Sequence, residues 1–542
     1  MPEELKRDLD LLLLTAIGVG AMVGSGVYTL PGLVASVSGP LSVLAVLLMS
    51  AITGLFVYIL AELGKELPTS GALYYFARGT FGNLAGFITG FSFYVSCFVG
   101  TAAIIYAFVL YASYFLKDLA SGLTLTPLGT ALALVLLAAV TAVNILGVKH
   151  GALLNLALTV LRVVPLLLFV AVGLLSFKPA NLEQPAPYGY GGLALAVAFG
   201  FWMFVGFESL VLVGDEVRRP SETIVKSALV TVLTVSALYT LLIASFTGSI
   251  NWAGLGLREG DWQALSSLSS PLADAARALG HEWLAWVMVL GAAISSAGCF
   301  SDWVLLQARV AYALAREGHL WGKLSYVHPR FRTPAAALLF SSLLTGVVIA
   351  LVPSFPSVIL IAMIAEFVPY GVSALSLAAS RAGLAPKVLG LAGLTLASLY
   401  VYWVCWPWTL TGAAVALASL GVYLAVRGGG AAGELGRSSW YIAYLLGLAA
   451  LSLLGDQTFT YNNFLPVSPL DILRTPLDIA AVAAFSAIIF AWTMLAGRPK
   501  TTPIGAVRGR IPAGGPRGEG GALPGVAQGI SASRAAADAC TR

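Results

Sequence analysis

The sequence predicts an all-α integral membrane protein with about 14 transmembrane helices. Of its 542 residues, 58% are hydrophobic and 10% are charged, and the mean hydropathy is +0.89. Soluble proteins carry about 25% charged residues. Apolar runs of about 18 residues or more, the length that crosses a bilayer, recur from one end of the chain to the other. Two of these runs, the first and the sixth, contain glycine-rich interruptions, which weaken a helix in its middle.

The predicted spans follow the apolar runs in order. We place them near residues 10–36, 41–64, 83–115, 127–148, 151–177, 191–214, 224–250, 283–313, 334–352, 355–379, 388–405, 409–426, 439–456 and 476–496. Residues 1–380 hold the first ten spans, at about 10–177 and 191–380, and residues 381–496 hold spans 11–14. Residues 497–542 are rich in Gly, Pro, Ala and Arg without apolar periodicity, so we expect a disordered tail.

Lysine and arginine determine the predicted orientation. With a cytoplasmic N-terminus, seventeen of these residues before the tail fall on the cytoplasmic side and five fall outside. An even number of spans then places both termini in the cytoplasm. The sequence therefore predicts a multi-pass protein of the cell membrane.

Cysteine and histidine usage argues against metal sites and disulfide frameworks. Cys97, Cys299 and Cys405 lie in apolar spans, Cys540 lies in the tail, and no CxxC pair occurs. The four histidines lack ligand spacing and fall outside the spans, which argues against a membrane enzyme. No GxxxxGK[ST] motif for ATP is present. We expect no metal, no cofactor and no nucleic-acid partner.

The first interruption is GAMVGSG at residues 20–26. Backbone N–H groups freed at the start of a half-helix form an anion cradle that the helix dipole strengthens, and a carboxylate suits that cradle. The alternative is close helix packing, because Gly20 and Gly24 have the spacing of a small-residue packing motif. Ser25 between two glycines, and the existence of a second interruption, favour solute binding.

The second interruption runs from Gly200 to Glu208. A carboxyl group at membrane depth is costly, so Glu208 is a candidate for a functional role. Trp202 and Phe207 could close over a solute or could pack in the core. Broken helices at matching places in two halves of a membrane protein are the expected mark of a transporter's substrate site.

Four segments carry a family resemblance. They are GVGAMVGSGVYTLPG (18–32), AELGKELPTSGALYYFARGTFG (61–82), WMFVGFESLVLVGDEVRRPSETI (202–224) and QARVAYALAREGHLWGKLSYVHPRFRTP (307–334). In this order they resemble the amino acid–polyamine–organocation permeases, over roughly residues 10–400. The resemblance implies the leucine-transporter fold, in which helices 1–5 and 6–10 form a 5+5 inverted repeat with helices 1 and 6 broken. Four additional C-terminal helices would follow this core.

The resemblance also implies where a substrate binds. The α-carboxylate would meet the amides of Ser25 and Gly26, beside Gly24, and the α-ammonium would meet the carbonyls of Met22, Trp202 and Val205, beside Gly206. Helices 3, 6, 8 and 10 would wall the side-chain pocket, with Cys97, Phe207 and Ser296 as candidates.

Arg162 stands in the fifth span, where several members of the resembled family carry a lysine whose ammonium resembles the sodium ion of related transporters. We expect its acceptors to be helix-1 carbonyls near Ile17 or the hydroxyls of Ser295 and Ser296. The alternative is an arginine that snorkels to the membrane surface. A fixed cation argues against sodium coupling, and arginine keeps its proton, which argues against proton coupling through this residue.

Glu366 lies in the tenth span, within MIAEFVPYG (363–371). Relatives often carry a small hydroxyl residue there, and Pro369 should bend the helix. A buried carboxyl could carry a proton or contact a cationic substrate; the alternative is one hydrogen-bonded acid that stays neutral.

We interpret the chain as a secondary transporter, a permease or exchanger, of amino acids or related organic amines that works by alternating access. The alternatives are a proton-coupled symporter, acting through Glu208 or Glu366, and a membrane sensor that binds an amine without moving it. The last two helices either mediate homodimer contacts or are additions without that role.

Overall fold

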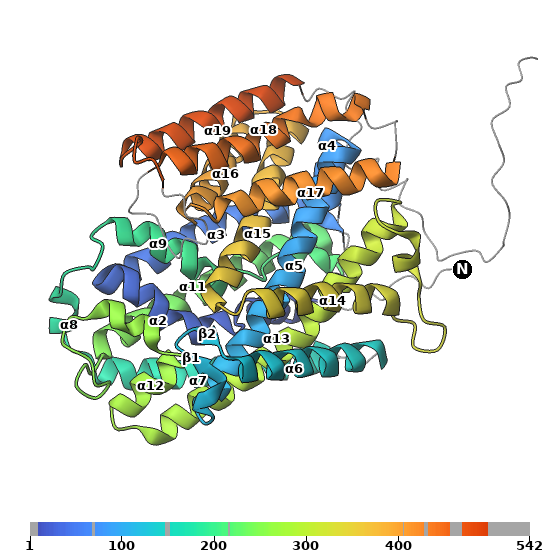
Figure 1. Ribbon diagram of the computed structural model, residues 1–542. Coiled ribbons are helices and arrows are strands. Elements are labelled where there is room, and N and C mark those ends of the chain that lie inside the picture. The colour runs from blue at the N-terminus through green and yellow to red at the C-terminus, as the bar shows by residue number, and fades with distance from the viewer. Residues whose placement is uncertain are drawn as a thin grey trace, which may run out of the picture.

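The computed structural model describes residues 9–67, 71–146, 152–214, 217–404, 406–427, 432–455 and 469–496. These residues form a bundle of long helices, and their one paired sheet is a two-stranded antiparallel ribbon, β1 (Ala120–Ser121) with β2 (Thr124–Leu125), in a loop (Figure 1). The predicted disordered tail at 497–542 lies outside the described residues.

The first half of the chain contains α1 (Leu11–Met22), α2 (Gly26–Ser38), η1 (Gly39–Leu41), α3 (Ser42–Gly64), α4 (Ala72–Phe81), α5 (Asn83–Ala112), η2 (Lys117–Leu119), α6 (Pro127–Leu146), α7 (Ala152–Leu175), α8 (Ala180–Glu183), α9 (Gly191–Gly200), η3 (Phe201–Phe204), α10 (Ser209–Leu212) and α11 (Pro220–Ser249). The second half contains η5 (Trp262–Ser267), α12 (Pro271–Ala278), α13 (Glu282–Arg316), η6 (Gly322–Ser325), α14 (Ala335–Leu351), α15 (Phe355–Ser380), α16 (Leu384–Trp403), α17 (Thr409–Arg427), α18 (Ala432–Leu454) and α19 (Leu477–Ala496).

Twelve helices among the described residues are long and apolar enough to cross a membrane, so the predicted count of fourteen is not confirmed. The difference has two sources. Residues 26–64 count as one stretch, although η1 separates α2 from α3 at Gly39, whose φ is +53°. The helices α1 and α14 are apolar but shorter than the others. Each predicted apolar segment nevertheless coincides with a helix or with an interrupted helix.

Both predicted interruptions break their helices. The first helix stops at Met22 and resumes at Gly26. The sixth span passes from α9 through the 3-10 turn η3 to an extended Val205, then to Gly206 with φ +117°, and restarts at Ser209. A Cβ atom at Gly206 would lie 2.5 Å from the Ala21 carbonyl oxygen. Glycine is therefore required there both by the backbone conformation and by the close approach of the two breaks.

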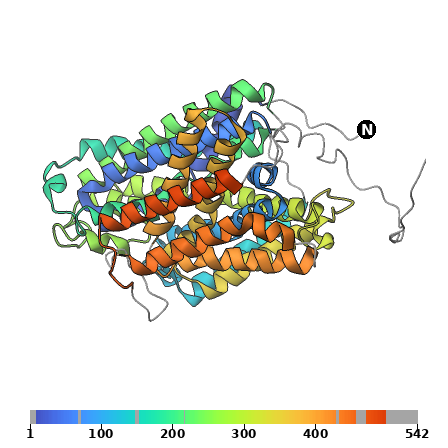
Figure 2. The same cartoon turned by 90° about the horizontal axis from the view of Figure 1, so that it is seen from above.

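The helix that follows the first break, α2, and the interrupted sixth span both lie in the interior of the bundle. In α5, in α15 and in the interrupted sixth span, at least 89% of the most apolar window is buried, against 28% in α6 and α19. The interior helices therefore pack against protein on all sides, whereas α6 and α19 leave most of their apolar surface outside the core. In Figures 1 and 2 the orange and red helices α17–α19 pack together along one side of the bundle.

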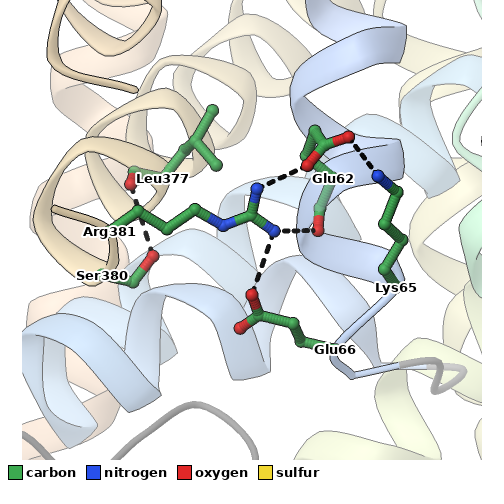
Figure 3. Close-up of polar contacts among 6 residues, drawn as sticks. All are labelled: Glu62, Lys65, Glu66, Leu377, Ser380 and Arg381. Carbon is green, nitrogen blue, oxygen red and sulfur yellow. Dashed lines mark hydrogen bonds and ion pairs between the residues drawn. The ribbon is translucent and has the colours of Figure 1, made fainter. Parts of the chain in front are cut away.

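An ion-pair cluster joins the end of α3 to the end of α15 (Figure 3). The Arg381 guanidinium binds the carboxylate and the backbone carbonyl of Glu62 and the carboxylate of Glu66, and Lys65 binds Glu62 from the other side. Two helices that are more than 300 residues apart in sequence are thereby fixed to each other at one edge of the bundle.

Candidate functional site

A cleft forms where the two broken helices face each other. About 280 Å³ of space, part of it open to solvent, lies between the ends of α1 and α2, the η3 turn, α5 and α13. Its walls are Ala21, Met22, Gly24, Ser25, Gly26, Ile104, Trp202, Val205, Cys299 and Trp303. No charged side chain is among these residues.

Six of the ten predicted substrate-binding residues line this cleft: Met22, Gly24, Ser25, Gly26, Trp202 and Val205. The other four do not. Gly206 packs on Ala21 behind the cleft wall, and Phe207 packs against the Tyr370 ring at a centroid distance of 5.1 Å. Cys97 and Ser296 are buried and are not among the residues that line the cleft. The roles of these ten residues in binding stay predictions.

The start of α2 presents unpaired donors. Among the described residues, no acceptor bonds to the N–H of Ser25 or of Gly26, and the Ser25 hydroxyl is buried without a partner. The first N–H groups of a helix have no intrahelical acceptor, and the helix dipole adds positive potential there. This end of the cleft is therefore suited to bind an anionic group.

The Met22 carbonyl is already occupied. It accepts the Tyr239 hydroxyl at 2.7 Å and the Gly24 N–H at 2.8 Å, and a carbonyl oxygen has two lone pairs. Met22 can serve as an ammonium acceptor only if one of these donors moves. The Val205 carbonyl, in the extended segment after η3, has no such partner among the described residues.

Two tryptophans form one wall of the cleft. Trp202 of η3 and Trp303 of α13 pack with ring centroids 5.5 Å apart. Both rings pack against Gly100 of α5. A Cβ atom at this position would lie 2.6 Å from the Trp303 ring and 2.7 Å from the Trp202 ring. Trp303, Cys299 and Ile104 were not predicted from the sequence. Cys299 and Trp303 share one helix face four residues apart, and Ile104 follows Gly100 at the same interval, which was the available signal.

Arg162 is fully buried, with 1% of its surface exposed, so the snorkelling alternative is wrong. Its Nη1 donates to the Gly20 carbonyl at 2.7 Å and contacts the Cys299 Sγ at 3.5 Å. The acceptor is a carbonyl of the first helix, as predicted, but it belongs to Gly20 rather than to a residue at Ile17, and no bond to Ser295 or Ser296 is found among the described residues. The guanidinium reaches almost one turn further along α1, and the Ser295 hydroxyl is engaged with the Val23 carbonyl at 3.0 Å.

Glu208 and Glu366 lie behind the cleft wall and do not line it. Glu208 Oε2 accepts the Gly206 N–H and the Tyr370 hydroxyl, both at 3.1 Å. Glu366 Oε2 accepts the Ser96 hydroxyl from α5, and its Oε1 has no hydrogen-bond partner in the part of the chain that the structure describes. The two acids predicted to couple transport are therefore close to one tyrosine.

Comparison with known proteins identifies the family. The sequence profile described as Amino acid permease matches residues 9–450. The chain belongs to the amino acid permease family. The match includes both helix breaks, Arg162 and Glu366, and it ends within α18, so α19 lies beyond it.

Two curated relatives and one solved structure are similar to this permease. The branched-chain amino acid permease BcaP of Bacillus subtilis (strain 168) is 29% identical over 364 residues, 65% of this chain and 76% of that protein. The aspartate-proton symporter of the same organism is 26% identical over 518 residues, 91% of this chain and 97% of that protein. A crystal structure of the Eremococcus coleocola manganese transporter covers 82% of this chain and 99% of that chain, with a TM-score of 0.49 and 15% identity.

These findings establish the general class of this permease. It is a multi-pass membrane protein with amino acid permeases and transporters among its relatives, and it is a secondary transporter.

Proposed function

We propose that this permease carries amino acids with small neutral side chains by alternating access, that it catalyses no chemical reaction, and that the cleft between the two helix breaks binds the substrate. The observation that carries the proposal is the meeting of both breaks at one cleft, with unpaired N–H groups of Ser25 and Gly26 at one end.

The two ends of the cleft differ in polarity. The N-terminus of α2 attracts the substrate carboxylate, and the Val205 carbonyl, together with the C-terminal end of α1, attracts the ammonium group. A zwitterion satisfies both ends at once. This arrangement supports the amino acid backbone, rather than a lone amine or a lone carboxylic acid, as the recognised unit.

The remaining walls select the side chain. Ile104, Trp202 and Trp303 are apolar or aromatic, and no charged side chain faces the space. An acidic or basic substrate side chain would lose its hydration there without gaining a partner. The space of about 280 Å³ includes the opening of the cleft to solvent, and the two packed tryptophan rings close one wall, so little room is left for a large side chain. Small neutral side chains therefore fit best.

Arg162 supports independence from sodium. Its guanidinium binds the Gly20 carbonyl next to the first helix break, where a metal cation would otherwise find the same oxygen. Arginine holds its charge at every accessible pH. The proposed cycle therefore runs on substrate exchange or on another ion.

The topology of the proposal follows the charge distribution of the loops. Both termini face the cytoplasm, the ten helices of residues 1–380 form the inverted-repeat core, and the helices of 381–496 are additions that either hold a homodimer together or do not. Besides the substrate and a second copy of the chain, the proposal includes the lipid bilayer as a partner of the outer helices.

The test is counterflow into proteoliposomes preloaded in turn with each of the twenty amino acids and with common polyamines, with and without sodium. We expect accumulation of labelled small neutral amino acids only in vesicles loaded with a related amino acid, and no effect of sodium. If none of the preloads drives uptake, the proposed function is wrong, and a sensor that binds without transport takes its place.

A further inference from the structure

Two acidic side chains are buried together on separate helices. Glu208, next to the start of α10, is 3% exposed, and Glu366 in α15 is fully buried. The Tyr370 hydroxyl, one turn after Glu366, donates to Glu208 and interacts with Glu366 as well. Segments about 160 residues apart in sequence thus bring two carboxyl groups to one hydroxyl group.

No basic group faces this acid pair, by which we mean Glu208 and Glu366. Among the described residues, neither acid forms an ion pair, and the titratable groups that interact with them are Cys97 of α5 and Tyr370 of α15. The α16 helix also packs on α15, and its Tyr400 hydroxyl is directed to the Ala198 carbonyl. The α3 helix contributes the Phe56 ring against Tyr370.

The hydrogen bonds at the pair do not support two negative charges. Three donors reach the pair: the Gly206 N–H, the Tyr370 hydroxyl and the Ser96 hydroxyl. The Glu366 Oε1 is buried, and none of the described residues donates to it. Two adjacent carboxylates in an apolar, cation-free interior repel each other and lack hydration, so a cation must join them.

We propose that Glu208 and Glu366 bind one proton between them and form the coupling site of this transporter. The proposal rests on the function proposed above. A proton is favoured over a larger cation because the acid pair does not line the cleft, and because no group of three or more His, Cys, Asp or Glu side chains occurs among the described residues. The proton enters from water on one side of the membrane and leaves to water on the other, with no other bond made or broken.

The acid pair connects to the substrate through one amide. Glu208 Oε2 holds the N–H of Gly206, which follows Val205 on the cleft wall and packs on the Ala21 carbonyl of the first break. A protonated carboxyl is a weaker acceptor for Gly206 and for Tyr370 than a carboxylate. Binding or loss of the proton therefore changes how firmly the two helix breaks are held at the cleft.

The first test uses the proton itself as the probe. Infrared difference spectra of the full-length protein in lipid, recorded over a pH series, follow the C=O stretch of protonated carboxyl groups. In Glu208→Gln and in Glu366→Gln, the pH at which the remaining acid protonates should shift by more than about one unit relative to wild type, because coupled acids titrate as a pair. A Glu317→Gln variant, which changes an acid paired with Arg78, serves as the matched control.

If each single substitution removes its own band and leaves the other band at the same pH, the acids do not share a proton and the proposal is overturned. Where a glutamine variant fails to fold, Tyr370→Phe keeps both acids and removes the hydroxyl between them, and it should also shift the titration. An unchanged titration in that folded variant counts equally against the proposal.

The second test measures coupling with a pH-sensitive dye trapped in proteoliposomes. Wild type should acidify the lumen when a substrate found by counterflow is taken up into unloaded vesicles. In both glutamine variants, the number of protons that enter per substrate molecule should fall at least tenfold, whatever the rate of substrate movement. Counterflow without any proton flux in wild type would refute coupling at the acid pair. Failure of counterflow itself would count against the proposed function and would leave the infrared result on the acid pair intact.

Discussion

Gly298 of α13 and Arg162 of α7 are in direct contact: a Cβ atom at position 298 would lie 1.9 Å from the arginine Nη2. The guanidinium fills the space that a side chain would occupy. Its Nε and Nη2 have no hydrogen-bond partner among the residues that the structure describes, so packing against this glycine and the bond to the Gly20 carbonyl together fix its position.

Gly298→Ala should therefore destabilise the protein by about 2 kcal/mol, the typical cost of overfilling a packed core. It should also displace the guanidinium and reduce transport. Thermal unfolding in detergent measures the first effect and counterflow the second. Gly421→Ala is the control, because a Cβ atom there would meet no described atom within 4 Å outside its own helical turn, and alanine favours helix by about 1 kcal/mol. Equal stability of the Gly298→Ala variant and wild type would contradict the contact.

Gly26 begins α2 on the cleft, and a Cβ atom there would lie 2.9 Å from the Trp202 ring. Gly26→Leu should fill the carboxylate end of the cleft and abolish counterflow. The folded state should remain, which size-exclusion profiles and thermal unfolding would establish. Retained substrate affinity in this variant would remove the first helix break from the binding site.

Gly100 and Trp303 should control the size of the accepted side chain in opposite directions. Gly100→Ala pushes the Trp202 and Trp303 rings towards the cleft, so the ratio of large to small neutral substrates in competition assays should fall. Trp303→Leu opens the wall, so that ratio should rise by about tenfold, at a stability cost below the 3–5 kcal/mol of a tryptophan-to-alanine change. Gly346→Ala, where contacts are ordinary, is the control. If the ratio of large to small substrates moved in the same direction in Gly100→Ala and Trp303→Leu, the tryptophan pair would not form the wall that limits side-chain size.

Asp274 gives a pH dependence of stability that is separate from transport. It lies in α12, outside the spans, and burial raises the pKa of its carboxyl from 3.8 to about 6. The folded protein keeps this proton to a higher pH than the unfolded chain does. The contribution of the protonated Asp274 to the free energy of unfolding is therefore full below pH about 4, and it is lost as the pH rises through about 6.

Asp274→Asn should remove that dependence and stabilise the protein at pH about 7 by up to about 3 kcal/mol, since one pKa unit equals 1.36 kcal/mol. Thermal unfolding at pH about 5 and about 7 measures the difference. Asp261→Asn, at an exposed ion pair with Arg258, should leave the dependence in place. A pH dependence that is identical in wild type and Asp274→Asn would exclude burial of this acid.

The sequence predicted the helical class, the positions of the apolar segments and both helix breaks, because these depend on local composition and on glycine placement. It also singled out Arg162, Glu208 and Glu366, because a charge within an apolar run is visible without a structure. The exact neighbours of these residues were not visible: the Arg162 acceptor lies on the expected helix but at Gly20, and Tyr370 was not recognised as the group beside both acids.

The sequence by itself therefore determined which groups need hydrogen-bond or charge partners in an apolar protein. These groups are the backbone at the two helix breaks, one buried cation and two buried acids. The tertiary structure alone decided how each is satisfied, because the partners come from helices far apart in sequence. Gly298 makes room for Arg162, Gly100 makes room for the tryptophan wall, and Gly206 lets one break pack on the other. Each of these depends on which helix faces meet, and the period of a single helix does not encode that.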